Sequence, residues 1–360
     1  MFKETNMQVE QNIGLSGRVG WEIINSDGST HSSSDGLHKN LILNQGLDKL
    51  GATGGANQGE GLPIAEAFTY CAVGTSNATP DVSQNGFMTT EVTRTNNYLT
   101  SGGGCGTNYT NTYTMVLFRT FDFPVGTFNG DLLAEVGFSN LGTKADNLFS
   151  RTLFKDGLGN PVVITVTNTQ ILRVRYELTI TVDTDTSWKA GSFNITGIGT
   201  VGFQKRFQSF ERYISGVGSL PLLREVGSNG VTTGEYYHFD FNNVNDNITF
   251  AAYSLTAFPN KESLPSPGSR ISNYSVVSPP GNINTCAITL LSKSLFQSLD
   301  WKRDYTFKLS TNDFNYSISC FALSAASFQP GGWVFYLDTP ITKDSLHELT
   351  VTVRVTWGRA

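Results

Sequence analysis

Charged residues are scarce in this sequence. Lys, Arg, Asp and Glu together make up 15% of its 360 residues, against about 25% in typical soluble domains. The net charge is −5, with both signs scattered along the chain. A protein that binds DNA or RNA directly needs a basic stripe to neutralise phosphates, and the sequence has none. Because Glu and Lys favour exposed helix faces, their scarcity also argues against a helical fold.

Long hydrophobic runs are missing too. No segment approaches the roughly 18 consecutive apolar residues of a membrane-spanning helix, so no membrane span is predicted. Residues 1–14 are polar and lack the apolar stretch of a signal peptide, and they predict a loose N-terminal arm. The protein is therefore expected to fold in a cytoplasm.

Cysteine and histidine are few and widely spaced. The four cysteines are Cys71, Cys105, Cys286 and Cys320, and the four histidines are His31, His38, His238 and His347. Neither a Cys-x-x-Cys pair nor a zinc-ligand spacing occurs among them, so no metal or cofactor site is predicted. Cys71, Cys286 and Cys320 lie in strand-like runs, where we expect buried free thiols. Nucleophilic catalysis has no Gly-x-Ser-x-Gly motif to support it, although a Ser-His-Asp group assembled in space leaves no such signature.

The abundant residues are Gly, Ser, Thr and Asn, together with 24 Phe and 13 Tyr. This mixture favours short strands joined by tight turns. The clearest alternation runs from Ile171 to Val182: Leu172, Val174, Tyr176, Leu178, Ile180 and Val182 share one face, and Arg173, Arg175, Glu177 and Thr179 share the other. A long strand with one dry and one wet face is typical of an antiparallel sandwich. Further strand-like runs cover residues 18–24, 68–74, 112–121, 132–138, 148–154 and 161–166.

One short helix is predicted over Asn44–Gly51. Asn44 is expected to cap its start, Gly51 to end it, and Leu47 and Leu50 to share a face. A helical turn near Ser219–Glu225 is the expected counterpart in the second half of the chain.

The order of the strand-like features recurs. Residues 68–72 correspond to 248–252, residues 111–117 to 284–290, and residues 171–182 to 346–357, at offsets of 180, 173 and 175 residues. A single duplication explains three matches in the same order. We therefore predict an all-β protein with an N-terminal arm (1–14) and two tandem jelly-roll-like antiparallel β-sandwich domains, residues 15–183 and 184–360, with one or two short helices.

Three segments invite a chemical interpretation, and each has a plainer one. Gly197 to Gly202 matches the Gly-x-Gly-x-x-Gly pattern of dinucleotide sites, but no strand–helix–strand unit surrounds it, and we expect a Gly-rich strand. Residues 51–61 are glycine-rich without a following Gly-Lys-Ser/Thr and predict a loop. Asp183 to Ser187 offers alternating oxygen ligands for calcium but lacks the Gly and Glu of an EF-hand loop, which favours an interdomain linker.

Carboxylates and aromatic residues leave alternatives open. Asp240, Asp246, Asp300 and Asp304 fall in or beside predicted turns, where Asp ordinarily serves backbone geometry. The paired carboxylates of a glycoside hydrolase, however, meet only in space. Trp188, Tyr236, Tyr237, Trp301 and Trp333 suit either stacking on a sugar or partner subunit, or a place in the core. No catalytic, cofactor-binding or metal-binding residue is assigned.

Several segments resemble a module of tail and tail-fibre proteins of tailed bacteriophages. The first two are Lys39 to Asp48 (KNLILNQGLD) and Tyr70 to Ser76 (YCAVGTS), the latter followed by Ala78-Thr79-Pro80 and Arg94-Thr95. The similarity extends through Glu135 to Ser139, Leu148 to Arg151, Pro161 and the strand after Thr167, and Leu349 to Arg359 resembles the terminal strand of similar virion proteins. It covers most of residues 15–182 and little of the second half.

The resemblance implies a non-enzymatic structural component of the virion, located in the tail, present in several copies and docked on other tail proteins. Fibre base, collar, sheath-like sleeve and adaptor are the positions it leaves open, and the arm 1–14 would order on a neighbouring subunit. The alternatives are a capsid or head-decoration protein with tandem jelly rolls, and a receptor- or carbohydrate-binding tail protein that contacts a host surface glycan. An enzyme such as a depolymerase is the least favoured class.

Overall fold

The computed structural model shows an all-β, sandwich-like protein, as the sequence predicts. The structure describes residues 3–51, 67–84, 90–105, 112–144, 148–183, 185, 187–195, 199–209, 219–220, 223–227, 235–239, 249–255, 257, 259–264, 285–293, 297–324 and 332–360. Within these ranges the only α-helix is α1 (Asn44–Gly51), which has the predicted bounds, and a 3-10 turn covers Lys261–Ser263.

The second predicted helical turn is wrong. Of the predicted turn, the described residues 219–220 and 223–225 fall in strands β15 (Ser219–Leu220) and β16 (Leu223–Gly227), and β16 pairs with β17 (Glu235–Phe239) in a small three-stranded sheet. An isolated helix of two turns is only marginally stable, so the backbone pairing with β17 prevails.

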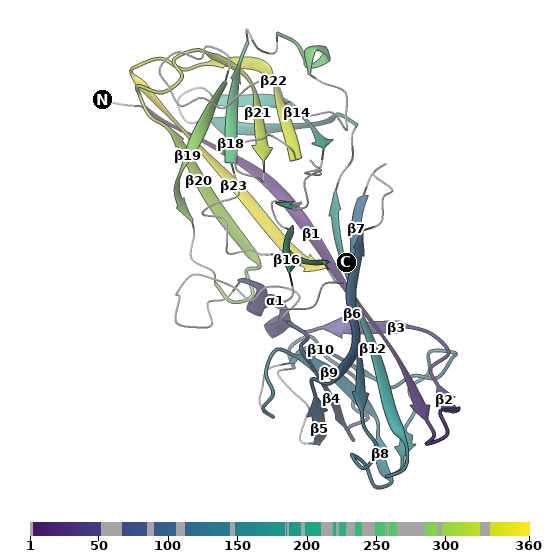
Figure 1. Ribbon diagram of the computed structural model, residues 1–360. Coiled ribbons are helices and arrows are strands. Elements are labelled where there is room, and N and C mark those ends of the chain that lie inside the picture. The colour runs from purple at the N-terminus through teal and green to yellow at the C-terminus, as the bar shows by residue number, and fades with distance from the viewer. Residues whose placement is uncertain are drawn as a thin grey trace.

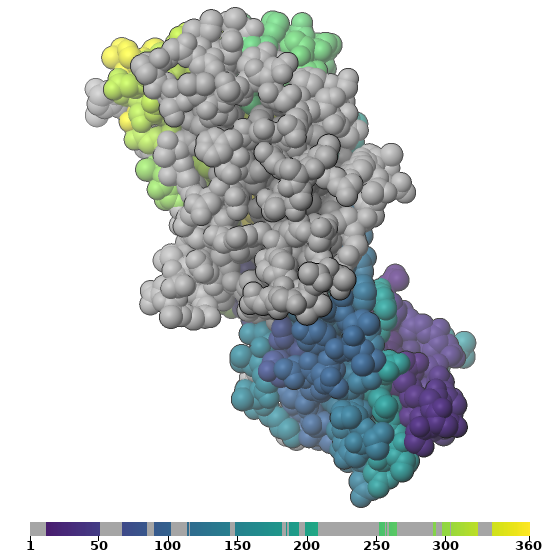
Figure 2. Space-filling view, viewed as in Figure 1, coloured from purple at the N-terminus to yellow at the C-terminus, as the bar shows by residue number. Residues whose placement is uncertain are grey.

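The other strands form two lobes that share one long strand, β1 (Lys3–Ile24) (Figure 1). The first lobe contains β2 (Thr30–Ser33), β3 (His38–Ile42), β4 (Tyr70–Gly74), β5 (Glu91–Thr95), β6 (Tyr98–Cys105), β7 (Thr112–Phe123), β8 (Asp131–Leu133), β9 (Glu135–Ser139), β10 (Leu148–Leu153), β11 (Ile164–Val166) and β12 (Ile171–Asp183). The second contains β13 (Lys189–Ile195), β14 (Gly199–Ser209), β18 (Thr249–Ser254), β19 (Thr285–Lys293), β20 (Lys302–Leu309), β21 (Ser317–Ser324), β22 (Gly332–Thr342) and β23 (His347–Arg359). The first lobe forms a compact body at one end of the molecule (Figure 2).

Apart from β8 and β11, which form a two-stranded sheet of their own, the strands of the first lobe pair antiparallel in one curled sheet. Neighbours follow the order β6, β7, β12, β1, β3, β10, β9, β4, β5, and β5 returns to lie beside β7. The alternation predicted for β12 is confirmed, because Leu172, Val174, Tyr176, Leu178 and Ile180 are fully buried and Arg175 is exposed.

The second lobe repeats this pairing order. Its neighbours run β20, β23 on one side and β13, β14, β22, β21, β18 on the other. β19 closes the series, since its first half pairs with β18 and its second half with β20. β19 thus takes the place of both β5 and β6, which only Asn96 and Asn97 separate in the first lobe.

This order tests the three sequence correspondences strand by strand. β4 and β18 have equivalent neighbours, as do β12 and β23, in agreement with two of the three matches. The third match, of residues 111–117 with 284–290, is wrong: the strand equivalent to β7 is β20, not β19. Threonine-rich strands look alike in sequence, and only their pairing separates them.

β1 differs most from its prediction. Instead of a loose arm, residues 3–14 form the first half of this strand, and residues 3–15 pair in parallel with β23. Residues 13–24 pair antiparallel with β12, and the other described pairings are antiparallel as well. A parallel partner so distant in sequence leaves no local signal, and the polar composition of the segment hid the strand.

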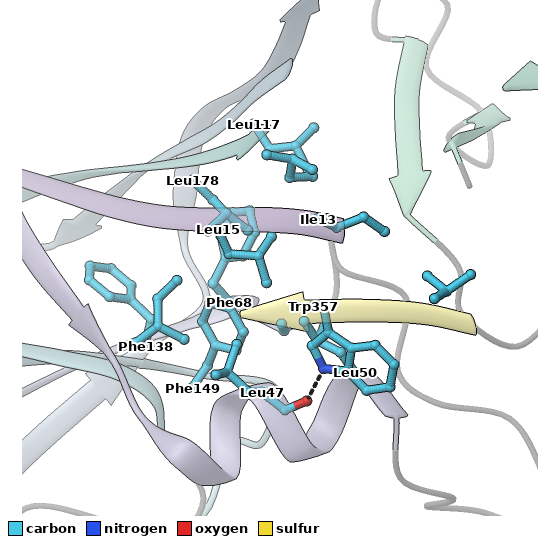
Figure 3. Packing of buried hydrophobic residues seen from close by; sticks show 14 of the residues in the cluster. Ile13, Leu15, Leu47, Leu50, Phe68, Leu117, Phe138, Phe149, Leu178 and Trp357 are labelled. Carbon is cyan, nitrogen blue, oxygen red and sulfur yellow. Dashed lines mark hydrogen bonds between the residues drawn. The ribbon is translucent and has the colours of Figure 1, made fainter. Parts of the chain in front are cut away.

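One buried hydrophobic cluster extends through both lobes. Where they meet, Ile13 and Leu15 of β1 lie among Leu47 and Leu50 of α1 and Trp357 of β23, all at most 3% exposed (Figure 3). The lobes therefore share a core as well as a strand.

Candidate functional site

Side-chain hydrogen bonds join the lobes where α1 meets the end of β23 and the loop 297–301. We call the residues that take part the interlobe joint: Asn44, Leu47 and Asp48 of α1, with Trp301, Trp357 and Arg359 of the second lobe. All of these residues except Trp301 belong to the segments that carry the phage-tail resemblance.

Asp48 fastens the loop of the second lobe. Its Oδ1 accepts from the backbone N of Leu299 at 2.9 Å and from Trp301 Nε1 at 2.8 Å, and its Oδ2 accepts from Ser298 Oγ. Leu299 and Trp301 both have left-handed backbones, with φ of 66° and 40°. Such conformations cost on the order of 1–3 kcal/mol each and persist only where the surroundings impose them. Asp48 is one source of that constraint.

Arg359 connects the end of β23 to the start of α1. Its Nε donates to Ile42 O at 2.6 Å and its Nη2 to Asn44 Oδ1 at 2.6 Å, and its guanidinium lies 5.2 Å from the ring centre of Trp301. The Asn44 side chain, which the sequence assigned to capping the helix, thus accepts from the other lobe. Burial lowers the pKa of Arg359.

Trp357 is the apolar centre of the joint. It is 3% exposed, and its Nε1 donates to Leu47 O at 2.9 Å (Figure 3). Its backbone N donates to Trp301 O at 2.9 Å. A buried tryptophan that is hydrogen-bonded at its one polar atom supplies both apolar area and a fixed orientation.

An open groove of about 420 Å³ lies beside the joint. Its lining consists of Asn12, Ile13, Gly14, Thr181, Thr356, Trp357, Gly358 and Arg359. Arg359 is the single charged side chain in this lining, and its donors face Ile42 and Asn44. The groove therefore brings no acid and base together.

A second constellation of the resemblance segments lies inside the first lobe. Glu135 of β9 and Arg151 of β10 form an ion pair at 2.6 Å, with both side chains fully buried. Glu135 also accepts from Ser76 N and Thr90 Oγ1, and Arg151 donates to Gln84 Oε1 and Ala78 O. Burial raises the pKa of Glu135, and Arg151 opposes that shift. The pair secures the segment after β4 against the sheet.

Two glycines of the same segments allow close approaches. A Cβ on Gly46 would lie 2.1 Å from Phe149 O, so α1 packs on β10 only because this position has no side chain. A Cβ on Gly74 would lie 2.5 Å from Glu135 Oε1. The resemblance segments thus shape the first lobe and attach it to the second.

The predicted aromatic candidates divide between core and surface. Trp333 is buried against Phe207, Trp301 belongs to the joint, and Trp188 is half-buried beneath Arg206 at 4.4 Å. Tyr236 and Tyr237 lie in β17, but their side chains are outside the described residues. Trp333 belongs to the main buried cluster and Trp301 packs against it, whereas Trp188 packs on a separate one.

The other candidates from the sequence are the cysteines, the histidines and the Gly-rich segment. Cys71 and Cys320 are buried free thiols, as predicted, whereas the side chains of Cys105, Cys286 and His238 lie outside the described residues. His31 is exposed, His38 contacts Ser34 O, and His347 contacts Asp344. Gly199 and Gly202 lie in β14, as the Gly-rich-strand interpretation predicts.

The two acidic candidates that the structure describes each pair with a basic side chain. Asp300 is in a turn and pairs with Lys302. Asp304, expected in or beside a turn, lies within β20, where Arg354 of the neighbouring β23 binds it at 2.7 Å. This cross-strand partner could not be predicted, because it depends on how β20 and β23 pair. Asp240 and Asp246 are outside the described residues. Asp185 accepts from Ser187 N and pairs with Lys189, and the described part of the chain has no group of three His, Cys, Asp or Glu suited to a metal.

Comparisons with family models, curated proteins and solved structures found no significant match. Among the described residues, no helix is long and apolar enough to cross a lipid bilayer.

Proposed function

We propose that this chain is a non-enzymatic structural component of a tailed-phage virion, associated with the tail and assembled in several copies. The observation that carries the proposal is that the residues in the segments resembling tail proteins hold the fold together. Glu135 and Arg151 form a buried ion pair, Gly46 and Gly74 allow close packing, and Asp48 attaches one lobe to the other. These are roles in shape and rigidity.

The two-lobed architecture supports the same proposal. Because β1 runs through both lobes and Asp48, Trp357 and Arg359 connect them at the joint, the lobes have a fixed relation. A rigid protein of this kind suits repeated contacts with neighbouring subunits at defined angles.

The test is quantitative mass spectrometry of purified phage particles, with heads and tails separated by density after gentle disruption. We expect the chain in intact particles at a reproducible copy number above one, enriched in the tail fraction. Its absence from particles would refute the proposal. A copy number close to that of the major capsid protein, with enrichment in heads, would replace it by the head-protein alternative.

A matched pair of variants links this test to the structure. Asp48→Ala removes the acceptor for the loop at 298–301, whereas Asp338→Ala removes an exposed carboxylate whose contact with Gln204 is long, at 3.4 Å. If joint rigidity matters for assembly, particles should incorporate the Asp338→Ala chain normally and the Asp48→Ala chain less. Equal incorporation of both would show that the contacts of Asp48 at the joint do not matter for assembly.

A further inference from the structure

We propose that β23 and β13 bound an acceptor position for a β-strand, and that residues 3–12 of one copy of the chain fill this position in a second copy. The proposal deepens the proposed function by naming the contact between copies, and it rests on that function only for the assembly in which the contact is used.

Besides the single strand β19 in place of β5 and β6, the two lobes differ in how their last strand is paired. In the first lobe the last strand, β12, pairs directly with the lobe's first strand, the second half of β1. In the second lobe the corresponding strands are β23 and β13, and residues 3–15 of β1 pair with β23 while β13 lies beside β1. The second lobe is thus completed by a segment that precedes the first lobe in the chain.

Without residues 3–12, β23 would have a long open edge. Its other edge is covered by β20, which pairs with residues 349–356. The register sets Met7 opposite Val351 and Val9 opposite Val353, and both valines are fully buried. An open edge of this length, with buried apolar residues along it, is a template for another strand.

The same segment is surplus to the first lobe. That lobe's pairing order is complete with residues 13–24 of β1, which bind both β12 and β3. One lobe therefore offers a strand that it does not use, and the other lacks one. A copy that donates its strand to a neighbour and accepts one from the opposite side makes a head-to-tail contact, which closes into a ring or continues as a filament.

In such an exchange a different copy supplies the strand, but the backbone pairing with β23 stays the same. The backbone hydrogen bonds between residues 3–12 and β23 are identical in both arrangements, so exchange is a low-cost route to association. The pivot would lie near Gly14, because Ile13 and Leu15 bind strands of both lobes.

Cysteine cross-linking in trans tests the exchange. In a chain with Cys105→Ser and Cys286→Ser, one tagged version carries Gln8→Cys and another carries Thr352→Cys, residues that the register places opposite each other. The two versions are co-expressed, purified at high protein concentration and treated with a short thiol-specific cross-linker. We expect a covalent dimer that contains both tags.

Two further samples make each outcome decisive. A single chain with both Gln8→Cys and Thr352→Cys reports the register itself, and a mixture of Arg18→Cys and Glu177→Cys chains, opposite each other on β1 and β12, should give no dimer. If the double variant forms only an internal cross-link and the mixed chains form no dimer, the strand stays in its own copy and the exchange is refuted. If no Gln8–Thr352 cross-link forms at all, the strand position is refuted as well.

These results are independent of the particle measurement. A chain found in tails whose mixed variants give no dimer would overturn the exchange alone. A chain that forms the dimer but is absent from particles would overturn the proposed function and leave the strand contact in place.

Discussion

At the scale of single residues, the first lobe depends on a charge pair that has no access to water. Glu135 and Arg151 are both fully buried, and removing one partner of such a pair leaves an uncompensated charge in the interior. The sequence placed both residues in resemblance segments. Their pairing could not be predicted, because it depends on the register of β9 and β10 and on the loop that supplies Gln84.

Breaking this pair should destabilise the protein strongly. For Arg151→Met we expect a loss of about 3–5 kcal/mol in the free energy of unfolding, measured by urea denaturation followed by circular dichroism. The control is Glu348→Gln, which breaks a partly exposed pair with Lys308 and should cost no more than about 1 kcal/mol. Similar losses for the two variants would contradict the assigned role.

Lys49 should make the free energy of unfolding depend on pH at alkaline pH. Burial lowers its pKa to about 8 from an ordinary value of 10.5, with a contribution from Arg94, and its Nζ donates to Asn140 Oδ1. The unfolded chain binds this proton more tightly than the folded chain does. The free energy of unfolding should therefore rise between about pH 8 and 10.5 through this group.

The variant Lys49→Met should lose that rise and be more stable than the original chain at pH 7, by on the order of 1–3 kcal/mol. Lys144→Met, at an exposed lysine, should keep the rise. The measurement is urea unfolding at a series of pH values from 7 to about 10.5. A rise that persists unchanged in Lys49→Met would show that another group causes it.

At the scale of elements, α1 and most strands of the first lobe follow from local sequence. The alternation in β12 and the capping residues of Asn44–Gly51 predict these elements correctly, because the buried face of the strand and the ends of the helix are set by residues close together in the sequence. The sequence predicted a loose arm for residues 3–14 and a position in or beside a turn for Asp304. Both lie in strands instead, because their strand conformation depends on pairing with β23, which is distant in sequence from residues 3–14 and separate from Asp304.

Gly46 is the position at which helix and sheet approach most closely. Gly46→Ala would set a Cβ 2.1 Å from Phe149 O, so α1 must move away from β10, and we expect a loss of about 1–3 kcal/mol or more in the free energy of unfolding. Gly358→Ala meets no atom within 4 Å and should change stability by less than about 0.5 kcal/mol. Equal tolerance of the two substitutions would contradict the packing described for α1.

At the scale of the whole molecule, two lobes with the same pairing order are united by β1 and the joint. The sequence showed a repeated order of features, and two of its three correspondences join strands with equivalent neighbours. The sharing of β1 could not be predicted, because parallel pairing of residues 3–15 with residues 347–359 leaves no trace in either segment alone. The joint was likewise invisible, since Asp48 and Trp301 meet only after both lobes have formed.

Releasing the loop at 298–301 should loosen the attachment of the lobes. Asp48→Ala leaves Leu299 N and Trp301 Nε1 without their acceptor, and we expect a loss of about 1–3 kcal/mol in the free energy of unfolding. A red shift in tryptophan fluorescence should accompany it, as Trp301 gains access to water. Asp338→Ala is the control and should show neither change. If Asp48→Ala also shows neither change, the Asp48 carboxylate does not hold the loop in place.

The most direct test of a second lobe completed by β1 is hydrogen exchange, measured by mass spectrometry, on the full chain and on a chain lacking residues 3–12. We expect the amides of β23 between Leu349 and Thr356 to lose protection in the shortened chain, while those of β7 and β12 keep it. Unchanged protection of β23 would show that β1 does not complete the second lobe.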